Sequence, residues 1–256
     1  MKRGIDQLLV DRGFAENRHK AQALLLAGQV LVDEQKVEKP GRLVDEGAAI
    51  RILRRERYVS RAGAKLQAAV DHFHIDVKER VCADLGASTG GFTDCLLQNG
   101  AKSVHAFDVG KGQLAWKLQS DARVTVRDKF NVRAIGADDL PEGIAFVCMD
   151  LSFISVTKIL SPLRAALEKR CEADETAAVD VVVLVKPQFE AGREDVEKGG
   201  IVRDPEARLR TLETVAGFAK TAGYKVLGHI PSPLPGAEGN IEFLLYLKYV
   251  NQFCKM

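Results

Sequence analysis

The sequence predicts an α/β protein in which a doubly wound, mostly parallel sheet follows a small α+β module. Four apolar runs, each short enough for a buried strand, lie at wide intervals with helix-like stretches between them: "VCADLGASTGG", "KSVHAFDVG", "IAFVCMDLS" and "VDVVVLVKP". This alternation favours parallel strands joined by crossover helices. The last segment, residues 224–249, places two strands around a loop rich in Pro and Gly, which predicts a closing hairpin antiparallel to the rest.

Length and composition are those of a globular protein. The chain has 256 residues, of which 46% are hydrophobic and 28% charged, enough for one large core and a small extra domain. No apolar run approaches the roughly 18 residues of a membrane helix, and acidic residues interrupt the N-terminus before a signal-peptide core could form. The five cysteines lie far apart, without the spacing of a disulfide framework or a metal site. We therefore expect a cytoplasmic protein with no bound metal and no stable membrane association.

The N-terminal region predicts a compact module. The apolar spacing in residues 3–13 predicts one helix that Gly13 ends, and a second helix begins at a cap, Asn17, and stops at Gly28. Residues 30–52 then alternate apolar and polar side chains between turn signals, which is typical of short antiparallel strands.

Charge is spread unevenly along the chain. Residues 1–64 hold 13 Lys and Arg against 9 Asp and Glu, and the remainder holds 24 against 26, so the net charge of +2 divides into +4 and −2. A basic excess on the smaller part indicates an anionic partner there. We expect a small domain over residues 1–58 and a larger one over 59–256, with a linker at about residues 53–60.

A glycine-rich turn in the larger region indicates a nucleotide-like cofactor. In "VCADLGASTGGFTDCLLQNG" a strand leads through Gly86, Gly90 and Gly91 into a helix. Glycines at such a turn allow a ligand to approach the backbone closely. Asp108 ends the next strand, at about the separation at which an acidic residue binds a ribose hydroxyl.

Asp84 helps to choose among nucleotide-like ligands. It lies at the end of the first strand, ahead of the glycines, where an acid would repel a pyrophosphate but suits a ligand with an amine and a sulfonium. S-adenosylmethionine (SAM) is therefore favoured, and NAD stays open. A phosphate-binding P-loop is excluded because no Gly-Lys-Ser/Thr follows the glycines.

Four charged residues are expected where doubly wound sheets bind ligands, beyond the carboxyl ends of the strands. Asp150 ends "IAFVCMD" and Lys186 ends "VDVVVLVK", so apolar runs deliver both to the same edge. Lys65 begins the helix before the first strand, and Glu242 lies on the expected final strand. Lys65 and Glu242 each also fit a solvated surface position. Together the four would form an alternating Lys-Asp-Lys-Glu cluster whose charges satisfy one another.

With these residues in place the chain resembles the TlyA-type (hemolysin A) ribosomal RNA 2′-O-methyltransferases. The resemblance covers essentially the whole chain and rests on "QLLVDRGFAENRHKAQALLLAGQVLVDEQKV", "YVSRAGAKL", "DLGASTGGFTD", "DLSFIS", "VKPQFEAGR" and "GNIEFLLYL". It implies a Rossmann-like SAM-dependent methyltransferase domain of the FtsJ/RrmJ type, preceded by a small α+β S4-like RNA-binding domain. The implied sheet is mostly parallel and seven-stranded, with an antiparallel last strand.

The resemblance also implies roles for single residues. A catalytic tetrad would consist of Lys65, Asp150, Lys186 and Glu242, and Lys186 would orient the ribose O2′ and, when transiently neutral, accept its proton. The cofactor would be bound by Asp84, Gly86, Ser88, Gly90, Gly91, Phe92 and Asp108, with Asp128 or Asn131 near the adenine. The partner would be ribosomal RNA or a ribosomal subunit, contacted through Arg3, Arg18, Lys20, Arg42, Arg54 and Arg55. The oligomeric state stays open.

Other functions stay open at this point. A base methyltransferase is disfavoured because "LSF" rather than a Pro-Pro-aromatic turn follows Asp150, and because Cys148, the one conceivable nucleophile, lies in mid-strand. S4-like modules also precede pseudouridine synthases, which need no glycine turn for SAM. A haemolysin-type membrane-active protein should carry a long apolar or basic amphipathic segment, and none is evident. A non-catalytic RNA-binding or ribosome-assembly factor would keep the fold as a scaffold, against which the intact tetrad argues.

Overall fold

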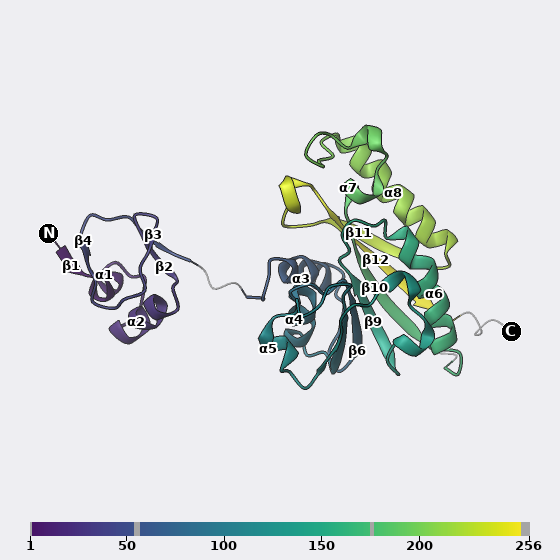
Figure 1. Cartoon of the computed structure of the whole chain (residues 1–256), viewed down its shortest axis with the longest axis horizontal. Coiled ribbons are helices and arrows are strands. Elements are labelled where there is room, and N and C mark those ends of the chain that lie inside the picture. The colour runs from purple at the N-terminus through teal and green to yellow at the C-terminus, as the bar shows by residue number, and fades with distance from the viewer. Residues whose placement is uncertain (1, 54–56, 175–176, 252–256) are drawn as a thin grey trace. The chain divides into compact units, whose positions relative to one another are not determined.

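The computed structural model describes residues 2–53, 57–174 and 177–251. The chain divides into two compact units, Met1–Glu56 and Arg57–Met256 (Figure 1). Arg54 and Arg55, two of the expected RNA contacts, lie outside the described residues. Every helix in the described part of the chain is too short or too polar to span a bilayer.

In the first unit, residues 2–53 form two helices that share one core with two small antiparallel sheets. The elements are β1 (Lys2–Gly4), α1 (Ile5–Asp11), α2 (Arg18–Leu26), β2 (Val30–Val32), β3 (Gln35–Lys36), β4 (Leu43–Asp45) and β5 (Ile50–Ile52). β1 pairs with β4, and β2 lies between β3 and β5. The cap at Asn17 is confirmed, because its side chain accepts the backbone N–H of Lys20. Ile5, Leu9 and Leu25 are fully buried and tie both helices to the strands.

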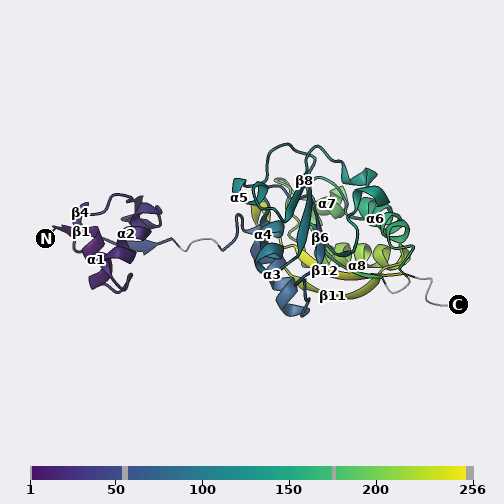
Figure 2. The same cartoon turned by 90° about the horizontal axis from the view of Figure 1, so that it is seen from below.

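The second unit is an α/β domain in which, within residues 57–174 and 177–251, seven strands form one sheet (Figures 1 and 2). They are β6 (Val81–Leu85), β7 (Ser103–Phe107), β8 (Val124–Arg127), β9 (Ile144–Met149), β10 (Ala178–Val185), β11 (Lys225–Pro231) and β12 (Phe243–Val250). Their order in the sheet is β11-β12-β10-β9-β6-β7-β8. β12 is antiparallel to both of its neighbours, so the mostly parallel sheet with an antiparallel last strand is confirmed. The expectation that the whole closing hairpin opposes the other strands is wrong, because β11 runs parallel to β10 on the far side of β12.

Helices cover both faces of this sheet (Figure 1). α3 (Ala62–His72) and α4 (Gly91–Gln98) pack on one face, and α6 (Thr157–Arg170) and α8 (Pro205–Thr221) pack on the other. The short helices α5 (Trp116–Gln119) and α7 (Pro187–Glu190) lie in the connections after β7 and β10. β10 explains the continuous apolar run in the sequence: Val181, Val183 and Val185 belong to the α6/α8 core, and Val182 and Leu184 belong to the α3/α4 core.

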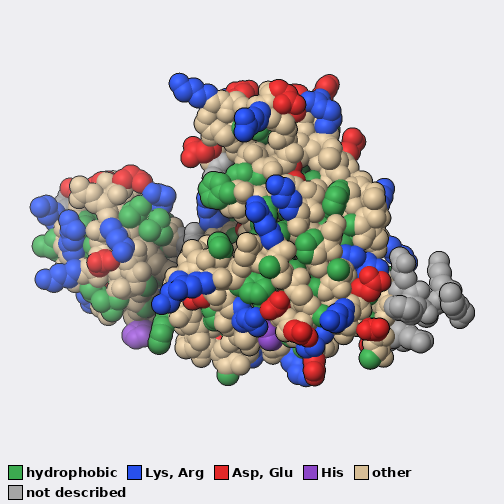
Figure 3. Space-filling model, turned by 45° about the vertical axis from the view of Figure 1, so that its right-hand side comes forward, with side chains coloured by type: hydrophobic (Ala, Val, Ile, Leu, Met, Phe, Trp, Pro, Cys, Tyr) green, Lys and Arg blue, Asp and Glu red, His purple; other side chains and the backbone are tan. Residues whose placement is uncertain are grey.

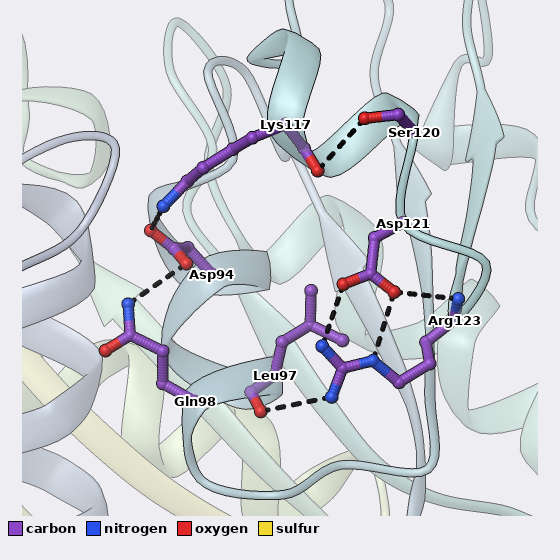
Figure 4. Close-up of polar contacts among 7 residues, drawn as sticks. All are labelled: Asp94, Leu97, Gln98, Lys117, Ser120, Asp121 and Arg123. Carbon is purple, nitrogen blue, oxygen red and sulfur yellow. Dashed lines mark hydrogen bonds and ion pairs between the residues drawn. The ribbon is translucent and has the colours of Figure 1, made fainter.

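A polar network fastens the start of α4 to its surroundings (Figure 4). The Asp94 side chain, in the first turn of α4, is nearly buried and accepts hydrogen bonds from the Val59 N–H and from Gln98 Nε2. Lys117 Nζ of α5 lies 2.9 Å from Asp94 Oδ2. A carboxylate at this position also interacts favourably with the N-terminal end of the helix. The network therefore fixes the end of α4 that follows the glycine-rich turn.

Candidate active site

The neighbouring strands β9 and β10 bring Asp150 and Lys186 together. Asp150 directly follows β9 and Lys186 directly follows β10, and the two strands pair in parallel. Lys186 Nζ lies 2.7 Å from Asp150 Oδ1 and donates a 3.0 Å hydrogen bond to Ser152 Oγ. The two charged side chains are only 12% and 19% exposed, so each depends on the other for charge compensation.

Lys65 and Glu242 form a second pair, which is more deeply buried. Lys65 lies in the first turn of α3, and its Nζ donates to Glu242 Oε2 at 2.5 Å. Glu242 lies one residue ahead of β12, not on the strand as expected, because β12 begins at Phe243. Gly236 covers the carboxylate so closely that a Cβ at this position would overlap Glu242 Oε1. A side chain at position 236 would therefore have to displace the Glu242 carboxylate from its place beside Lys65.

The four charged residues thus form two pairs. Within the described ranges, no hydrogen bond or ion pair joins Lys65 or Glu242 to Asp150 or Lys186. Asp150 and Lys186 line a cavity at the edge of the sheet, whereas Lys65 and Glu242 lie outside its lining.

Two cavities share a wall at this edge. The larger has a volume of about 520 Å³, and the smaller, of about 150 Å³, is lined by Lys186. Both are lined by Gly86, Ser88, Asp150 and Ser152. The larger volume is in the range of ordinary small-molecule sites. A ligand in the larger cavity would therefore touch the same residues that border the approach to Lys186.

The turn after β6 needs a glycine and is tied to Asp108. Gly86 has a φ of +88°, and a Cβ there would lie 2.5 Å from Asp150 O. Asp108, directly after β7, accepts the Ser88 N–H on Oδ2 at 2.8 Å and the Gly110 N–H on Oδ1 at 2.7 Å. Asp108 also lines the larger cavity, and its carboxylate keeps lone pairs that can accept from a ligand hydroxyl.

Asp84 lies beneath the turn and lines neither cavity. Its Oδ2 accepts from the Thr93 N–H at 2.9 Å and from Thr93 Oγ1 at 2.7 Å. Burial raises the pKa of Asp84 to about 7, although the bonds from Thr93 act in the opposite direction. Asp84 Oδ1 has no hydrogen-bond partner among the described residues. The Asp84 carboxyl, two residues before Gly86, is therefore held by the first turn of α4.

Some of the other expected cofactor residues line the cavities, and some do not. Asn131 lines the larger cavity, although its Oδ1 already accepts a backbone N–H. Asp128 is exposed and lines neither of the two cavities. Gly91 and Phe92 line the smaller cavity, and Gly90 is the N-cap of α4.

Sequence reasoning missed two parts of the site. Ser152, which binds Lys186, lies three residues after the end of β9, in the run "DLSF" that the resemblance already used. The larger cavity also has apolar walls, formed in part by Val109, Leu151 and Ile154. Such walls suit a flat, weakly polar group such as a nucleobase, and Asp108 and Gly86 suit a ribose and a close backbone approach. The cavity therefore fits a nucleoside-type cofactor.

Cys148 is not placed for catalysis. It lies within β9, is fully buried, and its Sγ lies 3.6 Å from Ala83 O. Burial raises the pKa of the Cys148 thiol well above its usual value, which disfavours the thiolate that a nucleophile needs.

The expected RNA contacts of the first unit are on its surface, and several are paired. Arg3, Arg18 and Lys20 each form an ion pair with an acidic residue of the same unit. The partner of Arg18 is Asp6, whose side chain is 1% exposed. Arg42 is exposed and forms no ion pair within residues 2–53. Figure 3 shows Lys and Arg side chains spread over the visible face of this unit.

Comparisons with known proteins agree with this geometry. Residues 58–249 match the model of the FtsJ-like methyltransferase family, and residues 3–50 match that of the S4 domain. YqxC of Bacillus subtilis, described as a candidate rRNA methyltransferase, is 45% identical over 250 residues, which cover 97% of this chain and 86% of the relative. The 16S/23S rRNA (cytidine-2′-O)-methyltransferase TlyA of Mycobacterium tuberculosis is 41% identical over 246 residues, which cover 95% and 89%.

A solved structure is also similar to this chain over nearly its whole length. A protein from Streptococcus thermophilus, described as a candidate hemolysin, superposes with a TM-score of 0.72 at 41% identity, over 99% of this chain and 92% of its own. The chain therefore belongs to the FtsJ-like methyltransferase family and, within it, to the TlyA (hemolysin A) group, in which an S4 domain precedes the methyltransferase domain.

Proposed function

We propose that this protein transfers a methyl group from SAM to a ribose 2′-hydroxyl of ribosomal RNA in the cytoplasm. Family membership supports methyl transfer, and the relative from Mycobacterium tuberculosis is named for the cytidine 2′-oxygen of 16S and 23S rRNA. One observation of this chain carries the proposal furthest. The ion pair between Lys186 and Asp150 lies where a nucleoside-sized cavity meets a smaller one.

The larger cavity would hold the adenosine part of the cofactor. SAM, when bound, supplies an electrophilic methyl group on a cationic sulfonium. Asp108 would accept hydrogen bonds from the ribose hydroxyls, and Leu151 and Ile154 would contact the base. Gly86 and Ser88, which line both cavities, would border the rest of the cofactor.

Lys186 would act on the substrate hydroxyl. Transfer to a ribose oxygen needs an in-line approach and an acceptor for the hydroxyl proton. Lys186 lines the smaller cavity, and Asp150 and Ser152 hold its amine in place. We therefore assign to Lys186 the orientation of O2′, with Asp150 as its anchor. In its neutral form, which a cationic cofactor nearby would favour, the Lys186 amine would also take up the proton of the hydroxyl.

The buried pair of Lys65 and Glu242 would complete the tetrad without touching either cavity. It links α3 to the segment before β12 and lines neither cavity. We assign to it the positioning of these elements rather than contact with the hydroxyl.

The S4 domain would bring the catalytic domain to structured RNA. Arg3, Arg18, Lys20 and Arg42 are the proposed phosphate contacts. Arg54 and Arg55 would extend this set into the linker, with the domain boundary at 58/59. Such contacts fix orientation on the RNA without reading its sequence.

Methyl transfer from radiolabelled SAM tests the proposal. Small subunits, large subunits, whole ribosomes and naked ribosomal RNA are each incubated with the full chain. Label in at least one RNA, at a ribose that resists alkaline cleavage, is the expected result, because cleavage needs a free 2′-hydroxyl. No label in any of them, despite SAM binding, would contradict the proposal and favour a non-catalytic RNA-binding factor. Liposome leakage without SAM would instead favour a membrane-active protein.

A further inference from the structure

We infer that Glu190 is a positioning residue of this site: its carboxylate ties the loop after β9 to the helix after β10 and thereby sets the geometry of Asp150 and Lys186. The inference rests on the proposed function and adds a residue to its machinery. Glu190 is the last residue of α7, four residues beyond Lys186.

The carboxylate of Glu190 uses both oxygens to hold the opposite loop. Oε2 accepts from Ser155 Oγ at 2.6 Å, and Oε1 accepts from the Val156 N–H at 2.7 Å. Ser155 and Val156 lie in the loop between β9 and α6, which begins with Asp150. Two hydrogen bonds accepted by one carboxylate fix direction as well as distance.

The loop after β9 and the segment after β10 are therefore joined at two places. Next to the strands, Lys186 contacts Asp150 and Ser152. At the far end, Glu190 makes its two hydrogen bonds. An ion pair of a flexible lysine alone would leave the loop free to swing about that contact. The hydrogen bonds to Glu190 fix the other end of the loop. The residues between the two attachments, 150–156, include those of this loop that line the cavities.

Backbone strain within this stretch shows that something must hold it. Phe153 has a φ of +64°, a left-handed conformation that non-glycine residues rarely adopt. Such a conformation persists only where surrounding contacts impose it. The Phe153 ring is 88% exposed and contacts Phe189 with ring centroids 5.2 Å apart, which gives it little burial. The hydrogen bonds on either side, from Lys186 and to Glu190, can impose it together with the packing of Leu151 and Ile154 against the core.

Charge compensation does not explain Glu190. No Lys, Arg or His forms an ion pair with it within residues 57–174 and 177–251. Burial raises the pKa of Glu190 above its ordinary value, against the two hydrogen bonds from Ser155 and Val156. An isolated carboxylate in a partly buried place is unfavourable unless its hydrogen bonds compensate. The Glu190 side chain therefore acts through its two hydrogen bonds with the loop after β9.

Three variants of the full chain separate positioning from simple stability. Glu190→Ala removes both hydrogen bonds. Glu190→Gln keeps an acceptor for the Val156 N–H and offers an N–H to Ser155 Oγ, whose own proton can go to Thr157 Oγ1 at 2.6 Å. Asp180→Ala is the matched control, because Asp180 is a buried carboxylate at the opposite end of β10 that accepts two 2.7 Å hydrogen bonds.

Turnover on RNA is the first readout. Glu190→Ala is expected to lower kcat about 10- to 100-fold, the order expected from small misplacements of reacting groups, with the KM for RNA unchanged. Glu190→Gln should restore turnover to within about threefold of the wild type. Asp180→Ala should lower the thermal midpoint while leaving kcat within about threefold. Equal loss in Asp180→Ala, or no rescue in Glu190→Gln, would overturn the inference.

Hydrogen exchange of residues 150–156 is the second readout and needs no substrate. Glu190→Ala should speed exchange of the Val156 N–H at least about tenfold, and neither other variant should. If the wild type methylates no RNA, the proposed function fails, and unchanged exchange in Glu190→Ala would separately reject the role of Glu190. If the wild type is active, normal turnover in Glu190→Ala rejects the inference and leaves the proposed function standing.

Discussion

Lys186 Nζ lies 2.7 Å from Asp150 Oδ1, and the two residues follow neighbouring parallel strands, β10 and β9. Their meeting is a consequence of topology, because parallel strands deliver the residues at their carboxyl ends to one edge of the sheet. Asp150 lines both cavities, whereas Lys186 lines only the smaller one. A substitution of Lys186 should therefore affect the rate of methyl transfer more than the affinity for the cofactor.

Asp108→Asn is expected to weaken SAM binding about 10- to 100-fold, since hydrogen bonds to a charged acceptor contribute about 1.5–3 kcal/mol. The variant keeps the shape of the side chain but loses the charge and one acceptor. Isothermal titration calorimetry measures the change in Kd. Asp76→Asn is the matched control, because Asp76 accepts one backbone N–H, is exposed and lines neither cavity. Comparable losses in both variants would contradict the assignment of Asp108.

Asp84→Asn should become more stable relative to the wild type as pH rises. The pKa of Asp84 is raised by burial from 3.8 to about 7, so between these values the folded protein keeps a proton that the unfolded chain has lost. The wild type therefore loses stability as pH rises from about 4 to about 7, by about 4 kcal/mol at most. Asparagine can still accept from Thr93 and does not titrate. Urea unfolding of both proteins at several pH values measures the difference, and a difference independent of pH would contradict the prediction.

Asp94→Ala is expected to lower the free energy of unfolding by about 2–3 kcal/mol, because it leaves the Val59 N–H without its acceptor and Lys117 without its partner. Asp121→Ala, which breaks the neighbouring, more exposed pair with Arg123 in Figure 4, should lower it by less than about 1 kcal/mol. Thermal and urea denaturation compare the two. Equal effects would mean that the Asp94 network does not fasten α4.

Arg42→Gln and Lys20→Gln should each weaken RNA binding and reduce its salt slope by about one. Arg18→Gln should also destabilise the S4 domain, because the buried Asp6 loses its partner. Filter binding to ribosomal RNA over a range of NaCl concentrations gives the slope. Lys169→Gln is a suitable control, since Lys169 is exposed in the last turn of α6. Slopes that stay at the wild-type value in Arg42→Gln and Lys20→Gln would reject these contacts.

The buried strands were predictable from sequence, and the loops between them were not. β9 and the part of β10 after Asp180 are apolar on both faces, so each appears as an uninterrupted run, and the residue after each run falls at the sheet edge. β8 (Val124–Arg127) is an edge strand with half-exposed residues and gave no such run.

The contacts of Glu190 had no signal in the sequence. Its partner Ser155 lies 35 residues away, in the loop after β9, and that loop takes a left-handed turn at Phe153 two residues before Ser155. Propensity cannot predict a left-handed phenylalanine, because surrounding contacts impose it. Asp84 is similar: its position at a strand end was predictable, but the hydrogen bonds that it accepts from Thr93 depend on how α4 begins.

The most direct test of the account is the turnover of Lys186→Ala. With the methylated RNA identified, single-turnover methyl transfer and SAM affinity are measured for this variant and the wild type. The account predicts a loss in rate of at least about 100-fold, as expected when a general base is removed, with the Kd for SAM changed less than about threefold. Near-normal turnover in Lys186→Ala would contradict the account.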